Sequence, residues 1–445
     1  MMTSLGGFGD NRLEEGGAFL LERLLDAGHR GISLRAMGGD RAGELRIDRF
    51  LKNPRVSPLE MVATARSHLL GRVQGRNILV IQDTTSLRDD GNKRGLYLHP
   101  AIAVDAADGA LLGLLAADFL VRDETPKTHC NKRDLARKES RRWVEATEQA
   151  SDLLTAGASR VTVIADREAD LYEMFACRPG DVLVRANHNR KLADGGWLDD
   201  SCEDLAELGR AEVEVQSGSG RTAIVALRAR RISIKRPKRN RAQWAAALPA
   251  YVELTLLDVR EVDPPAGQTP LHWRLLTTRE VESLSDAQTV AGFYRRRWVI
   301  EQVFRVMKTR GFDIEAVPVM ENASLKNLGC ATLIAAIQIQ QMLHDRDGNA
   351  GRPMTDVFDP ADQTLIEAIG RSLEGSTARQ RNPHPSGSLA HATWICARLG
   401  GWTGYYGKSG PIVLIRGQGN RISKSSQQLA EVGVVPARPL ELSAQ

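Results

Sequence analysis

Residues 294–308 read YRRRWVIEQVFRVMK, and this stretch decides how the rest of the chain is interpreted. It contains no Gly or Pro, and its apolar residues recur at helical spacing, so the sequence predicts a helix. At about 100° per residue, one side of this helix is apolar and is formed by Val299, Ile300, Val303, Val306 and Met307. The other side presents one carboxylate among cations and aromatic rings, namely Tyr294, Arg297, Trp298, Glu301, Arg305 and Lys308.

Arg297 and Glu301 are four residues apart, and two interpretations of this pair are open. The first is a surface ion pair that stabilises the helix by about 0.3–0.5 kcal/mol. The second is a site that holds a polyanion and a metal ion together, because an Arg-rich face around one acid suits both.

Two apolar, β-branched runs elsewhere in the chain favour the second interpretation. Residues 77–82 (NILVIQ) end at Asp83, and residues 160–165 (RVTVIA) end at Asp166. Each run predicts a buried strand with a carboxylate just past its carboxyl end, which is where ligands bind in open α/β sheets. Asp166 is also a candidate helix N-cap. Two such Asp and a Glu could hold two divalent cations, as phosphoryl transfer requires.

The residues Tyr294, Arg297, Glu301 and Lys308 have the spacing Tyr-x2-Arg-x3-Glu-x6-Lys. This pattern resembles the signature of DDE transposases of the IS-four (insertion sequence four) family, which includes the transposon-five transposase. Three further blocks resemble family blocks in the family order: IQDTTSL at 81–87, ADREADLYEMF at 165–175 and LGGWTGYYGKSGP at 399–411. The resemblance therefore spans most of the chain.

The resemblance implies a cut-and-paste DNA transposase. In such an enzyme Asp83, Asp166 and Glu301 bind two Mg²⁺ ions, with Mn²⁺ as a substitute. Hydrolysis at the transposon end frees a 3′-hydroxyl, which forms a hairpin in the transposon-five-like subgroup and later joins target DNA. The partners implied are the terminal inverted repeats, target DNA and a second copy of the chain in a synaptic homodimer.

The resemblance also implies further DNA contacts near the cut. Tyr294, Arg297 and Lys308 would hold a phosphate, and Arg190 belongs to a segment that reaches DNA in the family. Trp273 lies where the subgroup has a Trp that receives a flipped base, although a lone Trp at a strand end is most often core. Trp298, beside Arg297, is a second candidate for base stacking.

The order of the predicted elements indicates an α/β fold, and the resemblance implies a ribonuclease H-like catalytic core. It also implies that residues 1–74 form a helical DNA-end-binding domain and residues 75–345 the catalytic domain with an all-β insertion at 187–275. Residues 346–445 are predicted to be helical, and the resemblance implies that they form a dimerisation domain. Helices are predicted at 11–27, from 41, at 58–73 and at 131–154, and a hairpin at 96–104 and 111–120.

Two groups of basic residues outside the signature are candidates for contact with the DNA backbone, with a solvated protein surface as the alternative. The first group lies in the N-terminal helices and comprises Arg41, Arg46 and Arg49. The second lies in the β insertion and comprises Arg230, Arg231, Lys235, Arg236, Lys238 and Arg239.

Composition is ordinary for a globular protein of 445 residues, with 42% hydrophobic and 26% charged residues and a net charge of +5. The five cysteines are scattered without metal-binding spacing, which favours reduced thiols. No apolar run approaches membrane-spanning length. These features predict a cytoplasmic protein with no membrane partner, and the resemblance implies a bacterial, nucleoid-associated one.

Two other functions remain open from the sequence. A catalytically silent DNA-binding or inhibitory relative would bind no metal, whereas all three acids are present. A ribonuclease H-like DNA nuclease without strand transfer would cut DNA that lacks a specific end.

Overall fold

The computed structural model describes residues 2–27, 32–89, 95–122, 139–202, 205–215, 221–237, 248–308, 311–319, 321–405, 407–410 and 414. Its centre is a mixed β-sheet with the strand order β2-β3-β1-β5-β6-β10-β9-β8-β7, and β4 pairs with β3. The strands are β1 (Asn77–Gln82), β2 (Thr85–Asp89), β3 (Gly95–Asp105), β4 (Leu111–Arg122), β5 (Arg160–Ala165), β6 (Asp181–Arg185), β7 (Glu207–Glu214), β8 (Thr222–Lys235), β9 (Tyr251–Glu261) and β10 (His272–Thr277).

Strands β1, β5 and β6 run parallel in the middle of the sheet. Their residues are apolar and almost entirely buried, as expected for strands that are covered on both faces. Because parallel strands end at the same edge of a sheet, Asp83 after β1 and Asp166 after β5 lie at one edge. The bounds predicted for these two strands, 77–82 and 160–165, are confirmed.

The predicted hairpin is also confirmed, with β3 and β4 joined by a turn in which Gly109 adopts a positive φ of 87°. Strand β2, which is separated from Asp83 by Thr84 alone, was not predicted. It pairs with the start of β3 and carries Ser86 to the sheet edge.

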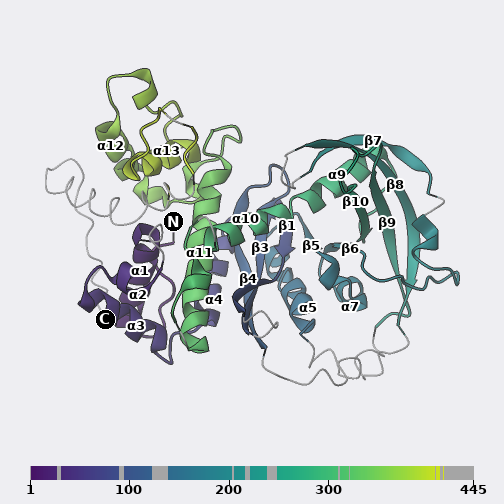
Figure 1. The fold of residues 1–445 in the computed structure, drawn as a ribbon, viewed down its shortest axis with the longest axis horizontal. Helices are drawn as coiled ribbons and strands as arrows, with labels where there is room; N and C mark the ends of the chain where they lie inside the picture. The colour runs from purple at the N-terminus through teal and green to yellow at the C-terminus, as the bar shows by residue number, and fades with distance from the viewer. Residues whose placement is uncertain are drawn as a thin grey trace.

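Four helices precede the sheet: α1 (Asn11–Ala27), α2 (Leu34–Gly38), α3 (Arg41–Lys52) and α4 (Pro58–Leu70). The side chains of Asp40 and Ser57 accept hydrogen bonds from Gly43 N and Glu60 N, which fixes the starts of α3 and α4. The long buried helix α11 (Asn322–His344) packs against α1, α3 and α4 and also against β4, which α4 contacts directly as well (Figure 1). Asn327 on α11 donates to Leu51 O and Val56 O, which ties α11 to the loop after α3.

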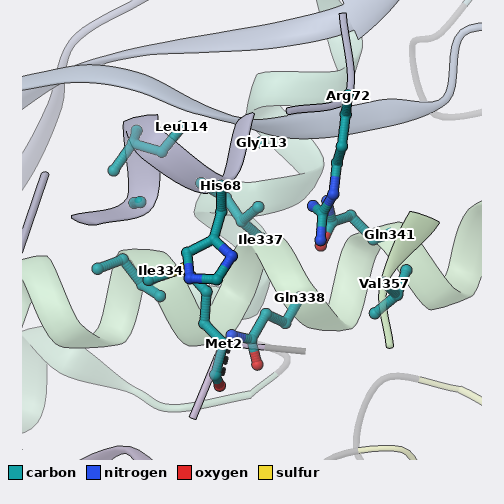
Figure 2. A pocket seen from close by; sticks show the side chains of 11 residues that line it. Met2, His68, Arg72, Gly113, Leu114, Ile334, Ile337, Gln338, Gln341 and Val357 are labelled. Atoms are coloured by element: carbon teal, nitrogen blue, oxygen red, sulfur yellow. Dashed lines mark hydrogen bonds between the residues drawn. The ribbon is translucent and has the colours of Figure 1, made fainter. Parts of the chain in front are cut away.

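A small cavity of about 20 Å³ lies between α4, β4 and α11 (Figure 2). Gln338 donates to Met2 O at 3.3 Å beside the cavity, and its buried Oε1 has no hydrogen-bond partner among the described residues. Burial lowers the pKa of His68, which also lines the cavity. A cavity of this size and polarity can hold one water molecule.

Strands β7, β8 and β9 continue the sheet beyond β10 as an antiparallel series. They lie in the 187–275 region where the sequence predicts β hairpins. They share the core of the central sheet, because Val225, Leu257 and Val259 pack in the same buried cluster as β1 and α10. Here α10 denotes Trp298–Met307.

Two helix predictions are corrected by the structure. The stretch 294–308 is not one helix, because α9 (Leu284–Arg295) ends before α10 begins. At the junction Arg297 N bonds Tyr294 O and Val299 N bonds Arg296 O, so the chain tightens to three-residue turns. Predicted helix 131–154 lies partly outside the described residues. The remainder divides into α5 (Arg141–Glu148) and α6 (Ser151–Thr155), separated at Gln149 and Ala150.

Three further α-helices are described. One is α7 (Tyr172–Ala176), which follows β5 in the chain, and the other two are α12 (Gln363–Leu373) and α13 (Leu389–Leu399) in the C-terminal region. Arg352, in the loop before α12, is buried and pairs with Asp105, Asp108 and Asp356. This ionic cluster attaches the C-terminal region to the β3–β4 turn. None of the helices within the described ranges is long and apolar enough to cross a membrane.

Candidate active site

Asp83 stands at the end of β1, where its backbone N–H donates to Pro100 O of the neighbouring strand. Its Oδ1 accepts from Thr84 N at 2.8 Å, and 23% of the side chain is exposed. Burial raises the pKa of Asp83 to about 6, against the opposing effect of the Arg297 charge. Asp166 and Glu301 add smaller repulsive contributions, so the three acids are electrostatic neighbours.

Asp166 follows β5 and precedes a short 3-10 helix, Arg167–Ala169. Its side chain makes no capping hydrogen bond with that helix, so the structure does not support the capping interpretation. Instead, Asp166 Oδ1 accepts from the Tyr294 hydroxyl at 3.0 Å. Burial, followed by the Asp166 charge, raises the pKa of Tyr294 well above its usual range, so the phenol stays protonated as a donor.

Arg297 joins the other two acids. Its Nη1 donates to Asp83 Oδ2 at 2.7 Å, and its Nη2 donates to Glu301 Oε1 at 2.6 Å. Burial alone would lower the pKa of Arg297, but the surrounding acids, Asp83 foremost, raise it overall. The pair with Glu301 is therefore not a solitary surface ion pair: only 18% of the Arg297 side chain is exposed, and it has a second carboxylate partner.

Four of the five residues predicted for the apolar side of the helix, Ile300, Val303, Val306 and Met307, are at most 1% exposed, and Val299 is half-buried. This packing turns Glu301 toward the sheet edge. The junction before α10 is held by Arg296, whose guanidinium donates to three backbone carbonyls of the β3–β4 turn, Asp105 O, Ala106 O and Ala107 O. The role of Arg296 could not be predicted from the sequence, because its partners are backbone atoms about 190 residues away.

Lys308 makes no hydrogen bond with Asp83, Asp166 or Glu301. Its Nζ lies 3.1 Å from Ser86 Oγ and 2.7 Å from Glu315 Oε1. Ser86 in turn donates to Glu315 Oε1 at 2.9 Å, so each of these three side chains contacts the other two. Lys308 thus lies beside β2 at the same edge, and Glu315 and Ser86 are partners that the signature alone does not reveal.

Trp273 on β10 is partly buried and packs edge-to-face on Tyr294, with ring centroids 5.2 Å apart. It therefore lies one ring away from Asp166. Trp298 begins α10, is half-buried, and has the guanidinium of Arg305 4.6 Å above its ring. Full burial in the core would exclude contact with a base, and neither ring is fully buried.

Arg190 has a different setting from the one the sequence suggests. Its guanidinium bonds the carboxylate of Asp170, and the two side chains are 9% and 0% exposed. Asp170 also accepts from Asn187 N and His188 N at 2.7 and 2.9 Å. The Arg190 charge is therefore matched by a buried acid, and the pair fixes the loop after β6 against the loop that begins at Asp166.

The basic residues proposed for the DNA backbone lie in several places. Arg41, Arg46 and Arg49 are exposed on α3, where Arg41 pairs with Glu44 and Arg46 donates to Glu15 O. Arg230, Arg231 and Lys235 are exposed on β8. Arg236 is half-buried and donates to Leu248 O. Lys238 and Arg239 lie outside the described residues.

A buried polar network holds the two residues on either side of Asp83, and it was not predicted from the sequence. Gln82 Nε2 donates to Trp143 O and Thr147 Oγ1, so its Oε1 is left to accept from His99 Nε2 at 3.1 Å. His99 Nδ1 must then accept from the Thr84 hydroxyl at 2.9 Å. Burial lowers the pKa of His99 to about 3, so the ring is neutral. The network fixes both residues that flank Asp83.

The donor set fits hard divalent cations, because three carboxylates on rigid elements offer the oxygen ligands that Mg²⁺ and Mn²⁺ prefer. The site already attracts positive charge, since a guanidinium occupies the gap between Asp83 and Glu301. In this arrangement, and counting described residues alone, no three His, Cys, Asp or Glu side chains are close enough to share an ion.

The comparison with protein families bears on this site. Residues 130–337 match the family described as transposase DDE domain. The matched range begins after Asp83 and includes Asp166, Glu301 and the whole of β5 to β10. A transposase DDE domain cleaves DNA and transfers strands with the help of divalent metal ions. The match to this domain indicates that the protein is an enzyme that binds metal ions, cleaves DNA and transfers DNA strands.

Proposed function

We propose that the protein is a cut-and-paste transposase similar to the transposon-five transposase of the IS-four family. In this proposal it hydrolyses DNA at transposon ends, passes through a hairpin intermediate and joins the freed 3′-hydroxyl ends to target DNA. The observation that carries the proposal is the linkage of the three acids by the signature residues. Arg297 bonds both Asp83 and Glu301, and Tyr294 bonds Asp166.

The proposed catalytic residues are Asp83, Asp166 and Glu301, which would hold two Mg²⁺ ions, with Mn²⁺ as a substitute. When bound, the metal ions supply activation of the attacking water and stabilisation of the leaving oxygen. Burial of Asp83 and the rigid strand end limit reorganisation of the ligands during the reaction.

The signature donors would bind the DNA phosphate next to the cut. The planar guanidinium of Arg297 and the protonated hydroxyl of Tyr294 both point to the acids, so they are placed to contact a phosphate that enters there. Lys308 would contact a phosphate nearer to β2, beside Ser86. Arg190 is better assigned to holding the loop after β6, because Asp170 already pairs with it.

Trp273 and Trp298 are the proposed stacking residues for a base that leaves the duplex at the hairpin. Trp273 packs on Tyr294, which would place a flipped base near the Asp166 side of the site. The N-terminal helices, with Arg41, Arg46 and Arg49, would bind the terminal inverted repeat, and the C-terminal region would support a synaptic homodimer. The protein would act in the bacterial cytoplasm, on DNA of the nucleoid.

The test uses purified protein and a duplex that carries the terminal repeat of its own element, incubated with Mg²⁺. We expect a nick at the end and then a hairpin product, both absent for Glu301→Gln. The exposed Glu282→Gln provides a matched control that should cut normally. A double-strand break without a hairpin would remove the hairpin route and the stacking role of Trp273. Binding of a verified end sequence without any cut would overturn the proposal.

A further inference from the structure

Four exposed side chains form a row across neighbouring backbone segments of the β region. Lys235 at the end of β8 pairs with Tyr251 at the start of β9. Lys235 N donates to Lys191 O, and Leu192 bridges Ile234, so Lys191 lies opposite Lys235 in antiparallel register. Lys191 in turn bridges Trp197. The order across the surface is therefore Trp197, Lys191, Lys235, Tyr251.

Directly paired residues in antiparallel segments project on the same side, so these four side chains share one face. The residues that follow them in each segment project the opposite way and are buried: Leu192, Leu198 and Val252, with Ile234 on β8, are at most 8% exposed. The outward face is fixed by this core. On it, Trp197 is 46% exposed and Tyr251 is 44% exposed, although both are large hydrophobic side chains.

The charges in the row favour an anionic partner. Lys191 and Lys235 are both exposed and lie directly opposite one another, an arrangement that destabilises a sheet when nothing neutralises it. The Lys235 ammonium lies 5.6 Å from the centre of the Tyr251 ring. Glu253 is exposed on the same face opposite Ser233 and provides a nearby acid. Two adjacent lysines flanked by two aromatic rings can hold backbone phosphates between two stacked bases.

The row is attached to the loop of the active site. Lys191 follows Arg190, whose guanidinium is bound to Asp170, and Asp170 also accepts from the backbone of residues 187 and 188. Movement of the segment that carries Lys191 and Trp197 is therefore restrained by a residue four positions after Asp166. A strand held on the row would lie on a surface fixed to the catalytic core.

We propose that Trp197, Lys191, Lys235 and Tyr251 bind unpaired DNA, with bases stacked on the two rings and phosphates at the two lysines. The choice of DNA rests on the proposed function. An unpaired strand is specified because the faces of bases within a duplex are covered by their neighbours. Adjacent β segments are about 4.8 Å apart, so the row spans about 14 Å, which suits two or three nucleotides.

The experiment measures fluorescence anisotropy of a labelled single-stranded oligonucleotide of mixed sequence, and of an abasic oligonucleotide of the same length. Trp197→Ala and Tyr251→Ala are each expected to weaken binding of the base-containing strand by about fivefold or more, and to leave abasic binding unchanged. Lys191→Gln combined with Lys235→Gln should weaken both and reduce the salt dependence. Tyr405→Ala and Lys408→Gln, exposed residues elsewhere, serve as controls and should change neither.

A second measurement uses the unaltered protein and does not depend on the variants folding. A bromodeoxyuridine-substituted strand is photo-crosslinked, and the labelled peptides are mapped. We expect crosslinks at Trp197 or Tyr251. Crosslinks confined to other peptides, or equal loss of abasic and base-containing binding in Trp197→Ala, would overturn the stacking surface.

These outcomes are separable from those that test the proposed function. If the protein forms the nick and hairpin but the aromatic variants bind unpaired DNA normally, only the surface is wrong. If the aromatic variants lose base-dependent binding but the unaltered protein never cuts its terminal repeat, the surface stands and the cut-and-paste proposal fails.

Discussion

Arg297 donates a hydrogen bond to Asp83 at 2.7 Å, across 214 residues of sequence, and this contact closes the candidate site. The same guanidinium reaches Glu301, so one cation keeps two acids from repelling each other at the sheet edge. A planar fork can bond two carboxylates at once, whereas the single ammonium of a lysine is a compact point charge.

Arg297→Lys should therefore keep the positive charge but lose the bridge. We expect cleavage of the terminal repeat to fall at least about tenfold, while the melting temperature changes less, because the lysine keeps one positive charge among the acids. Arg305→Lys on the same helix is the matched control and should cut nearly normally. Equal activity of Arg297→Lys and the unaltered protein would show that the bridge is dispensable.

Arg296 is predicted to position the site without touching DNA. Its bonds to the carbonyls of Asp105, Ala106 and Ala107 hold the junction from which Arg297 and Glu301 project. Arg296→Ala should lower kcat for cleavage and leave KM for the end duplex unchanged, since the substrate contacts remain. Arg295→Ala, an exposed neighbour that pairs with Glu214, should alter neither constant. A change in KM alone would indicate a direct DNA contact instead.

His99 should make the fold sensitive to mild acid. Its pKa is lowered to about 3 in the folded protein by burial, so below its ordinary value of 6.5 the unfolded chain takes up a proton that the folded chain cannot. Between pH 6.5 and pH 3 the free energy of unfolding should thus decrease as the pH falls, by at most about 1.4 kcal/mol per pH unit.

Asp83 acts in the opposite direction, because its pKa of about 6 lies above its usual 3.8 and protonation between these values favours the folded state. Comparison with His99→Gln isolates the histidine. Denaturant titrations from pH 7 to pH 5 should give a flatter profile for His99→Gln than for the unaltered protein. Parallel profiles would show that His99 does not control this dependence.

The sequence predicts the strands that carry Asp83 and Asp166 well, because buried parallel strands are continuous apolar runs with clear ends. It predicts the apolar side of α10 for the same reason. It misses the break at Arg296 and Arg297, since both residues are good helix formers and the break depends on backbone contacts with a distant turn. It likewise misses the partner of Arg190, because the pairing with Asp170 arises only when two loops meet at the sheet edge.

The ion pair of Asp170 and Arg190 should be worth far more than an exposed pair. Removing one partner of a buried pair typically costs about 3–5 kcal/mol, because the other charge stays buried. Asp170→Ala should approach that loss in the free energy of unfolding. Arg190→Met should lose less, since Asp170 keeps two backbone donors. A double-mutant cycle measures the coupling, with the exposed pair Asp48 and Lys52 as a control that should show much weaker coupling.

Divalent metal ions should compete with Arg297 for the acids. Its guanidinium uses one oxygen of Asp83 and one of Glu301, so metal binding must replace those bonds. Mn²⁺ should raise the melting temperature of the DNA-free protein, and a chelator should reverse the rise. At a Mn²⁺ concentration of 100 times Kd, the gain in the free energy of unfolding should be about 2.7 kcal/mol. Arg297→Gln leaves three acids without their cation, so calorimetric titration should show tighter Mn²⁺ binding although cleavage is lost. Weaker Mn²⁺ binding in Arg297→Gln would mean that Arg297 organises the metal ligands and does not compete for them. If Mn²⁺ raises the melting temperature of Asp83→Asn as much as that of the unaltered protein, the metal binds elsewhere.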